Sequence, residues 1–442
     1  MDNIELLKFN PWWERKNAIG EDKHIREFET KKIKYYPDFS NAKKGIYIIR
    51  GPRQVGKTTF LKLNIKNSLD NYDQRSILYF SFDLVKDREQ AYDVIKNYLE
   101  RFAPAPPRKF FLDEITGIKG WPNIIKLLVD RGDISNQDTV FISGSNALDL
   151  WHGSEMLPGR GIEGNEYYFL PCSFRTYTKL FQVDLPGISL LKYDKDFLKA
   201  HLTKLLTLNK LFFNYLETGG FMSVINEGVN ELMLERYIRW IEGDIIKINR
   251  SPILAKEILG AILRKKCSQF SFEAIKKETK IGSHNTVIDY SEMLDELLIT
   301  KHIEKATIDP FEILHRKEKK AYLRDPLLFK ICESWAKSNL DESCKVESVV
   351  FEHLYRLTDV YFYNDGKKEV DFVLKTNNKI MGVEVKWQNT ISSFDYLKLK
   401  RFDSGFLLTK DKFEIKDNVI VCPVSLFLAT LDVGEFVKRR FF

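Results

Sequence analysis

The chain has 442 residues, of which 44% are hydrophobic and 30% are charged, and its formal net charge is +7. This length predicts about two to four domains rather than one core, and the composition excludes a chain dominated by disorder. The basic excess permits an anionic partner without demanding one. No apolar run approaches about 18 residues and no signal-peptide pattern occurs at the start, so we expect a cytoplasmic protein with no membrane partner.

Five cysteines are scattered along the chain without CxxC spacing: Cys172, Cys267, Cys332, Cys344 and Cys422. This spacing indicates neither a disulfide framework nor a zinc site. We therefore expect all five to be reduced thiols.

Strand-like and helical runs alternate in the first part of the chain. The predicted strands are 45–50, 77–83, 110–112 and 140–143, and the predicted helices between them are 60–70 and 91–102. This alternation is typical of a parallel sheet flanked by helices, so we predict an α/β fold. From residue 173 to 250 the apolar spacing is helical.

A glycine-rich loop follows directly on the predicted strand at 45–50. In such a loop, backbone N–H groups at the positive end of a helix bind nucleotide phosphates, a lysine adds charge and a hydroxyl coordinates Mg²⁺. An ordinary glycine turn is the alternative. We predict an ATP site, with Lys57 as a catalytic charge and Thr58 on the metal, that consists of Gly51, Pro52, Arg53, Gln54, Val55, Gly56, Lys57, Thr58 and Thr59.

Two carboxylates end the predicted strand at 110–112. Asp113 is predicted to hold Mg²⁺, and Glu114 is predicted to orient or deprotonate the attacking water. After the next strand, the hydroxyl of Ser145 is predicted to contact the γ-phosphate. Arg160 stands in a turn and is either an arginine finger, in its own site or in a neighbouring subunit's, or a surface residue.

Further motifs accompany the loop and the carboxylate pair: Gly120-Trp121, Gly144-Ser145, Gly159-Arg160 and residues 170–175. Together these motifs resemble a family of archaeal and bacterial AAA+-like P-loop ATPases with an appended C-terminal domain. Asn10-Pro11-Trp12-Trp13 is also similar to the archaeal members, whereas Cys172 departs from the aliphatic residue expected at its position. The resemblance implies an ATPase core with a helical lid.

Residues 270–306 read as a short helix, a glycine turn, a longer helix and an extended stretch, which is typical of a winged-helix segment. Ser283 is predicted to cap the second helix and to leave His284, Asn285 and Thr286 exposed where such folds meet DNA. A role in packing alone is the alternative, because this helix also carries four carboxylates. The lysines predicted to contact phosphates are Lys276, Lys277, Lys280, Lys301 and Lys305.

Two strand-like runs at 370–375 and 381–386 carry Asp371, Glu384 and Lys386. Because alternate residues of a strand share a face, Glu384 lies with Lys386, and Asp371 reaches Glu384 across the hairpin. The two carboxylates are predicted to hold Mg²⁺, or Mn²⁺ in its place, while the lysine stabilises or activates the attacking water. A Glu-Val-Lys strand without this function is the alternative.

This group resembles the PD-(D/E)XK nuclease superfamily, which includes resolvases that cut branched DNA. The resemblance covers about the last hundred residues and matches the superfamily's acidic and basic positions to Asp371, Glu384 and Lys386. The helix upstream adds a further carboxylate, which is Glu347 or alternatively Glu352. Gln388 is a further polar candidate on the same face as the lysine.

The sequence as a whole predicts four parts: an ATPase core at 1–175, a helical lid at 176–250, a winged helix at 251–325 and a restriction-endonuclease-like α/β domain at 326–442. We expect Mg²⁺-dependent ATP hydrolysis coupled to binding or remodelling of duplex or branched DNA. Self-association is expected because arginine fingers often act between subunits. Two alternatives remain: a nucleotide-controlled switch that binds only proteins, and a DNA-dependent ATPase whose nuclease fold is inactive.

Overall fold

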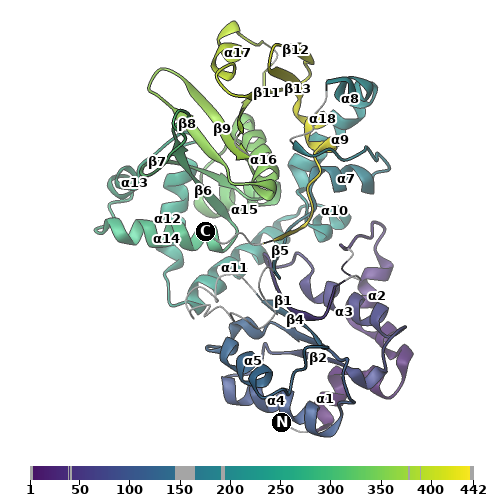
Figure 1. Ribbon diagram of the computed structural model, residues 1–442. Helices are drawn as coiled ribbons and strands as arrows, with labels where there is room; N and C mark the ends of the chain where they lie inside the picture. The colour runs from purple at the N-terminus through teal and green to yellow at the C-terminus, as the bar shows by residue number, and fades with distance from the viewer. Residues whose placement is uncertain are drawn as a thin grey trace. The chain divides into compact units, whose positions relative to one another are not determined.

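The computed structural model describes residues 3–37, 39, 42–144, 165–190, 195–376, 379–388 and 390–438. The chain divides into two compact units, Met1–Leu170 with Glu435–Phe442, and Pro171–Gly434 (Figure 1). The segments predicted as lid, winged helix and C-terminal domain therefore fall in the second unit, apart from Glu435–Phe442, which belongs to the first unit. No helix among these described residues is long and apolar enough to cross a membrane.

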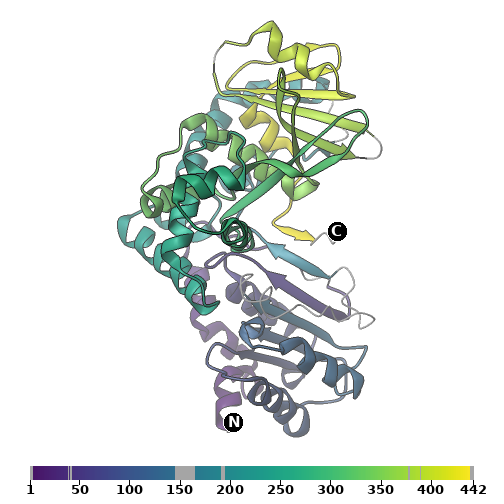
Figure 2. The same cartoon turned by 90° about the vertical axis from the view of Figure 1, so that its left-hand side faces the viewer.

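A six-stranded sheet forms the centre of the first unit, in the order β14-β5-β1-β4-β3-β2 (Figure 2). Neighbouring strands are parallel except β14, which is antiparallel to β5. The strands include the four predicted from the sequence and are β1 (Gly45–Arg50), β2 (Ile77–Ser81), β3 (Lys109–Asp113), β4 (Thr139–Gly144), β5 (Glu166–Phe169) and β14 (Phe436–Lys438).

Helices lie on both sides of this sheet. The path from β1 to β2 crosses the sheet in one direction and the path from β2 through β3 to β4 returns, so right-handed crossovers place α3 on one face and α4 and α5 on the other. The helices of the unit are α1 (Asn3–Phe9), α2 (Lys23–Thr30), α3 (Lys57–Ser68), α4 (Arg88–Arg101) and α5 (Trp121–Asp130).

The N-terminal Asn-Pro-Trp-Trp motif covers the edge strand β2. The Asn10 side chain donates to the Tyr79 carbonyl at 3.0 Å and accepts the Tyr79 N–H at 2.7 Å. The Trp12 and Trp13 indoles both donate to the Ile77 carbonyl. Because an edge strand has backbone groups without a neighbouring strand, this motif gives them partners and positions Tyr79.

An eight-stranded sheet runs through the second unit, in the order β12-β13-β11-β10-β9-β8-β6-β7. The strands β8, β9 and β10 run antiparallel in turn, and β11 pairs parallel with β10. The strands are β6 (Thr300–Ala306), β7 (Ile313–Leu323), β8 (Tyr361–Asn364), β9 (Glu369–Thr376), β10 (Lys379–Lys386), β11 (Ser404–Thr409), β12 (Glu414–Lys416) and β13 (Val419–Pro423).

The second unit begins with a helical stretch, as the apolar spacing predicts, and further helices pack against its sheet (Figure 1). Its helices are α7 (Phe174–Leu180), α8 (Lys195–Ala200), α9 (Leu205–Thr218), α10 (Met222–Glu227), α11 (Glu231–Lys247), α12 (Pro252–Leu263), α13 (Phe272–Thr279), α14 (His284–Glu296), α15 (Pro326–Ala336), α16 (Glu342–Leu357), α17 (Ser393–Leu399) and α18 (Val424–Thr430).

Cys267 and Cys344 form a disulfide, so the expectation of five reduced thiols is wrong for this pair. Their Cα atoms lie 5.7 Å apart, and the bond joins the loop after α12 to the start of α16. The spacing of the cysteines along the chain could not predict this disulfide, because only tertiary packing brings Cys267 and Cys344 together. The other three cysteines are free and buried.

A carboxylate holds the turn at Gly219, which joins α9 to α10. Gly219 has a φ of 68°, and a Cβ there would lie 2.1 Å from an Asp325 oxygen. The two Asp325 oxygens accept the N–H groups of Gly220 and Leu327 at 3.0 and 2.8 Å. Burial is the largest cause that raises the pKa of Asp325, from 3.8 to about 7.

This raised pKa predicts a specific dependence of stability on pH. Because the folded-state pKa lies above the unfolded-state value, the contribution of Asp325 to stability is fully present below pH 3.8 and is lost as pH rises through about 7. The loss should be on the order of a few kcal/mol. In thermal denaturation, the melting temperature of wild type should exceed that of Asp325→Asn by less at pH 8 than at pH 5. A difference that grows with pH would contradict the assignment.

Candidate nucleotide site and C-terminal carboxylate cluster

Lys57 lies inside the glycine-rich loop at the start of α3. Its ammonium donates to the carbonyls of Gly51 and Pro52 at 3.0 and 3.3 Å, and the residue is 6% exposed. Gly56, which precedes the helix, has a φ of 106°, a conformation that side chains rarely adopt. At Gly51 a Cβ would lie 2.3 Å from the Phe169 carbonyl oxygen. Both glycines are therefore required by the local backbone.

Asp113 ends β3 opposite the loop and is 2% exposed. Its Oδ2 accepts hydrogen bonds from the Thr58 hydroxyl at 2.8 Å and from the Tyr79 hydroxyl at 3.0 Å. Its Oδ1 accepts a hydrogen bond from the Ser143 hydroxyl. The predicted pair of Thr58 and Asp113 is thus brought together by the fold, in contact with hydroxyls from the two strands beside β3.

Glu114 follows Asp113 in a left-handed conformation, with a φ of 55°. Its N–H donates to the Ser143 hydroxyl at 3.1 Å. Burial raises the pKa of the Glu114 carboxyl, and the neighbouring Lys57 ammonium opposes this increase. A half-buried carboxyl with a raised pKa beside the phosphate loop is suited to accept a proton from water.

Gly144 ends β4 against Thr116, which lies just after Glu114. A Cβ at Gly144 would lie 1.6 Å from the Thr116 hydroxyl oxygen, so the close approach of these two segments requires glycine. The predicted contacts of Ser145 and Arg160 lie outside the described residues.

The residues present fit ATP and Mg²⁺. Thr58 and Asp113 supply the hydroxyl and carboxylate oxygens that Mg²⁺ prefers, and the loop begins a helix whose N–H groups attract phosphate. The parts that fit are Lys57 for the phosphates, Thr58 with Asp113 for the metal, and Glu114 for water.

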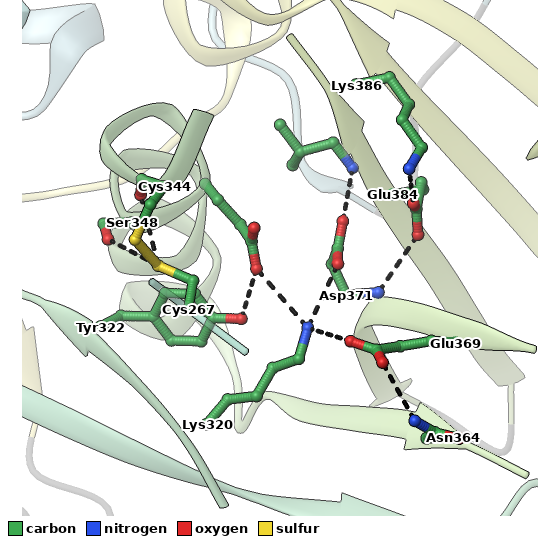
Figure 3. Close-up of polar contacts among 12 residues, drawn as sticks. Cys267, Lys320, Tyr322, Cys344, Ser348, Asn364, Glu369, Asp371, Glu384 and Lys386 are labelled. Atoms are coloured by element: carbon green, nitrogen blue, oxygen red, sulfur yellow. Dashed lines mark hydrogen bonds and ion pairs between the residues drawn. A yellow bond between two sulfur atoms is a disulfide. The ribbon is translucent and has the colours of Figure 1, made fainter. Parts of the chain in front are cut away.

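The C-terminal acidic residues also converge, in the second unit. Asp371 on β9 lies beside β10, where the Asp371 N–H donates to Glu384 Oε2 at 3.3 Å and the Val385 N–H donates to Asp371 Oδ2 at 3.0 Å. Lys386 contacts Glu384 Oε1 at 3.0 Å. The predicted set of Asp371, Glu384 and Lys386 therefore shares one site (Figure 3).

Glu347 on α16 joins this site. Its Oε1 accepts the Tyr322 hydroxyl at 2.7 Å. Burial is the largest cause that raises the pKa of Glu347 and of Glu384, and Asp371 is the next cause for both. We call Glu347, Glu369, Asp371 and Glu384 the carboxylate cluster.

Three lysines neutralise the carboxylate cluster, and sequence reasoning found only one of them. Lys320 from β7 lies 2.7 Å from Glu369, 3.3 Å from Asp371 and 3.7 Å from Glu347 (Figure 3). Lys398 from α17 contacts Glu384 together with Lys386. Within the described residues, no group of three or more His, Cys, Asp or Glu side chains is arranged to hold a metal ion.

Glu352, the alternative helical acid, serves a different role. Its Oε1 accepts a hydrogen bond from the Arg356 guanidinium at 3.1 Å, and Arg324 contacts its other oxygen. All three side chains are under 10% exposed. Glu352 therefore belongs to a buried ion-pair network, while Gln388 is exposed.

The helix pair α13–α14 has the predicted cap, but of the three residues predicted to be exposed at the start of α14, Thr286 is half-buried. The Ser283 hydroxyl accepts the Thr286 N–H at 3.4 Å, His284 and Asn285 are exposed, and Val287 is buried. Of the predicted phosphate-contacting lysines, Lys277 and Lys280 are exposed. Lys301 instead lies 3.8 Å from Asp295, and Lys276 lies 3.7 Å from Glu273.

Comparison with known families matches residues 43–178 to a family described as AAA domain. This part of the chain is therefore similar to AAA domains. Residues 345–427 match a domain of unknown function, DUF4143. An uncharacterized protein of Methanocaldococcus jannaschii is 24% identical, over 93% of this chain and 90% of its own length.

Solved structures show only partial likeness to the chain, with low TM-scores. The Orc1 protein of Aeropyrum pernix in complex with DNA has 14% identity and a TM-score of 0.28, covering 73% of this chain and 96% of that one. AMPPCP-bound DnaA from Aquifex aeolicus has 15% identity and a TM-score of 0.25, covering 65% and 92%.

Sequence reasoning on the candidate nucleotide site missed Tyr79 and Ser143 as partners of Asp113. Both lie on strands beside β3, and the polar Ser143 near the end of an apolar strand was the available signal. Tyr79 gave no such signal, because aromatic residues are common in strands.

Proposed function

We propose that this chain is a Mg²⁺-dependent ATP hydrolase that acts on DNA. The observation that carries the ATPase part is the contact between Thr58 and Asp113 beside the buried ammonium of Lys57. Bound Mg²⁺ would neutralise phosphate charge. Lys57 binds the phosphates, Glu114 orients the attacking water and accepts its proton, and Tyr79 and Ser143 keep Asp113 in place.

The proposed DNA contact is a winged-helix segment made by α13, α14 and the hairpin β6–β7. The exposure of His284 and Asn285 at the start of α14 supports contact with a DNA groove. The hairpin adds the exposed Arg316 and Lys317, and Lys277 is exposed on α13. These cations support binding to phosphates, and such binding weakens as salt concentration rises.

For the C-terminal part we propose a restriction-endonuclease-like fold. The convergence of Asp371, Glu384 and Lys386 on two paired strands, with Glu347 supplied by a helix, supports this proposal. We also propose that the helices between residues 176 and 250 form a lid, that Ser145 contacts the γ-phosphate, and that the chain self-associates with Arg160 as its arginine finger.

The test of this function is ATP turnover with duplex, single-stranded and branched DNA. We expect DNA to stimulate wild type at least about threefold at low salt, and we expect Lys57→Ala to lose about 100-fold or more in every condition. Replacing both Arg316 and Lys317 by alanine should remove most of the stimulation while basal turnover stays. Lys126→Ala, an exposed lysine on α5, is the matched control.

Two outcomes would contradict the proposal. If no DNA changed ATP turnover and the protein showed no affinity for DNA at low salt, a nucleotide-controlled switch that binds proteins would be favoured. Turnover that survives Lys57→Ala would remove the ATPase assignment itself.

A further inference from the structure

Lys320 lies in the middle of the carboxylate cluster. It comes from β7, is 2% exposed, and its ammonium contacts acidic side chains from α16 and from β9. Burial disfavours the charged ammonium, whereas Glu347, Glu369 and Asp371 stabilise it. A lysine buried to this degree is held in place by these carboxylates.

The oxygens that a metal would need already have partners. Asp371 Oδ1 contacts Lys320 at 3.3 Å, and Asp371 Oδ2 accepts the Val385 N–H at 3.0 Å. Glu384 Oε1 contacts two lysines, and its Oε2 accepts the Asp371 N–H. Glu347 Oε1 faces both Lys320 and the Tyr322 hydroxyl.

A divalent cation does not fit beside this ammonium. Mg²⁺ requires oxygen ligands at about 2.1 Å in octahedral geometry, and it would repel a positive charge held at hydrogen-bond distance from the same oxygens. Among the described residues, the carboxylates from β9, β10 and α16 contact lysine ammonium groups and leave no open position for a cation.

We propose that the Lys320 ammonium occupies the position that a catalytic metal would take in the carboxylate cluster, so that the C-terminal domain does not cut DNA. The DNA part rests on the proposed function above, whereas the exclusion of metal is a property of this site alone. Among the functions considered from the sequence, this corresponds to an ATPase whose nuclease-like fold is inactive.

The test is Mn²⁺ binding to the full-length, nucleotide-free protein, followed by electron paramagnetic resonance and by thermal denaturation. Wild type and Asp371→Asn should bind the same amount of Mn²⁺, because the wild-type cluster should hold none. Lys320→Met should gain one site with an apparent Kd at least about tenfold lower than any in wild type, since the repelling charge is removed. Adding Asp371→Asn to Lys320→Met should abolish this gain, and Lys320→Arg, which keeps the charge, should show none.

Thermal denaturation provides the second readout. Mn²⁺ should raise the melting temperature of Lys320→Met and leave that of wild type unchanged, because a ligand stabilises only the protein that binds it. Asp371-dependent Mn²⁺ binding or DNA cleavage by wild type would overturn the proposal, as would a folded Lys320→Met that gains no Mn²⁺. If Lys320→Met does not fold, comparing Mn²⁺ binding by wild type and by Asp371→Asn still tests whether the cluster holds a metal. Only the cleavage readout uses DNA. The proposed action on DNA can therefore fail while the exclusion of metal holds, and the reverse is also possible.

Discussion

Replacing Glu114 by glutamine should lower ATP turnover by about 100- to 1,000-fold while nucleotide binding is retained. The amide keeps the size of the side chain but cannot accept a proton from water. The backbone that places it is unchanged, because the contact with Ser143 uses the Glu114 N–H. Single-turnover hydrolysis, together with the affinity for a fluorescent ATP analogue, separates the chemical step from binding.

Glu89→Gln is the matched control for this change. Glu89 is exposed at the start of α4, so the same substitution there should leave turnover within about twofold of wild type. If Glu114→Gln hydrolysed ATP at the wild-type rate, another group would have to activate the water. A large loss of nucleotide affinity would instead assign Glu114 to binding.

Glu352→Gln should have the largest effect on stability. Glu352 lies between the guanidinium groups of Arg324 and Arg356, all of them buried. Removing its charge takes away the carboxylate that both buried guanidinium groups contact, which costs about 3–5 kcal/mol. The corresponding decrease in melting temperature is about 6–20 °C.

The control for this prediction is Glu257→Gln on α12, where the carboxylate is exposed and the change should be within about 0.5 kcal/mol. The two variants are compared by thermal and chemical denaturation at pH 7. If the melting temperature of Glu352→Gln lay within about 1 °C of that of wild type, the ion-pair network would contribute little to stability. Glu352 would then again be a candidate for the helical acid of the carboxylate cluster.

The sequence was enough to predict that Thr58 and Asp113 lie together, because the parts of this candidate nucleotide site are local. A loop between one strand and one helix brings Gly56, Lys57 and Thr58 together, and Asp113 ends a strand of the same parallel sheet. Parallel strands end at one edge, so short patterns were enough to predict that these residues meet. The partners on neighbouring strands depend on strand order, which local patterns do not contain.

The C-terminal cluster was predicted only in part for a related reason. Asp371 and Glu384 lie on one hairpin, whose pairing follows from period-two alternation. Lys320 lies in a segment predicted to belong to another domain, and it reaches the cluster because β6 and β8 join the two groups of strands in one sheet. No local pattern indicates that join, and the disulfide of Cys267 with Cys344 escaped prediction for the same reason.

The pairing of β14 with β5 affects how the protein is made. The whole second unit separates these strands along the chain, yet Phe436 stacks on Phe169 at 5.0 Å in the sheet of the first unit. During synthesis the ribosome makes β14 only after the phosphate loop and the whole second unit, and strands far apart in sequence pair slowly. The edge of β5 therefore stays open on the nascent chain until β14 emerges.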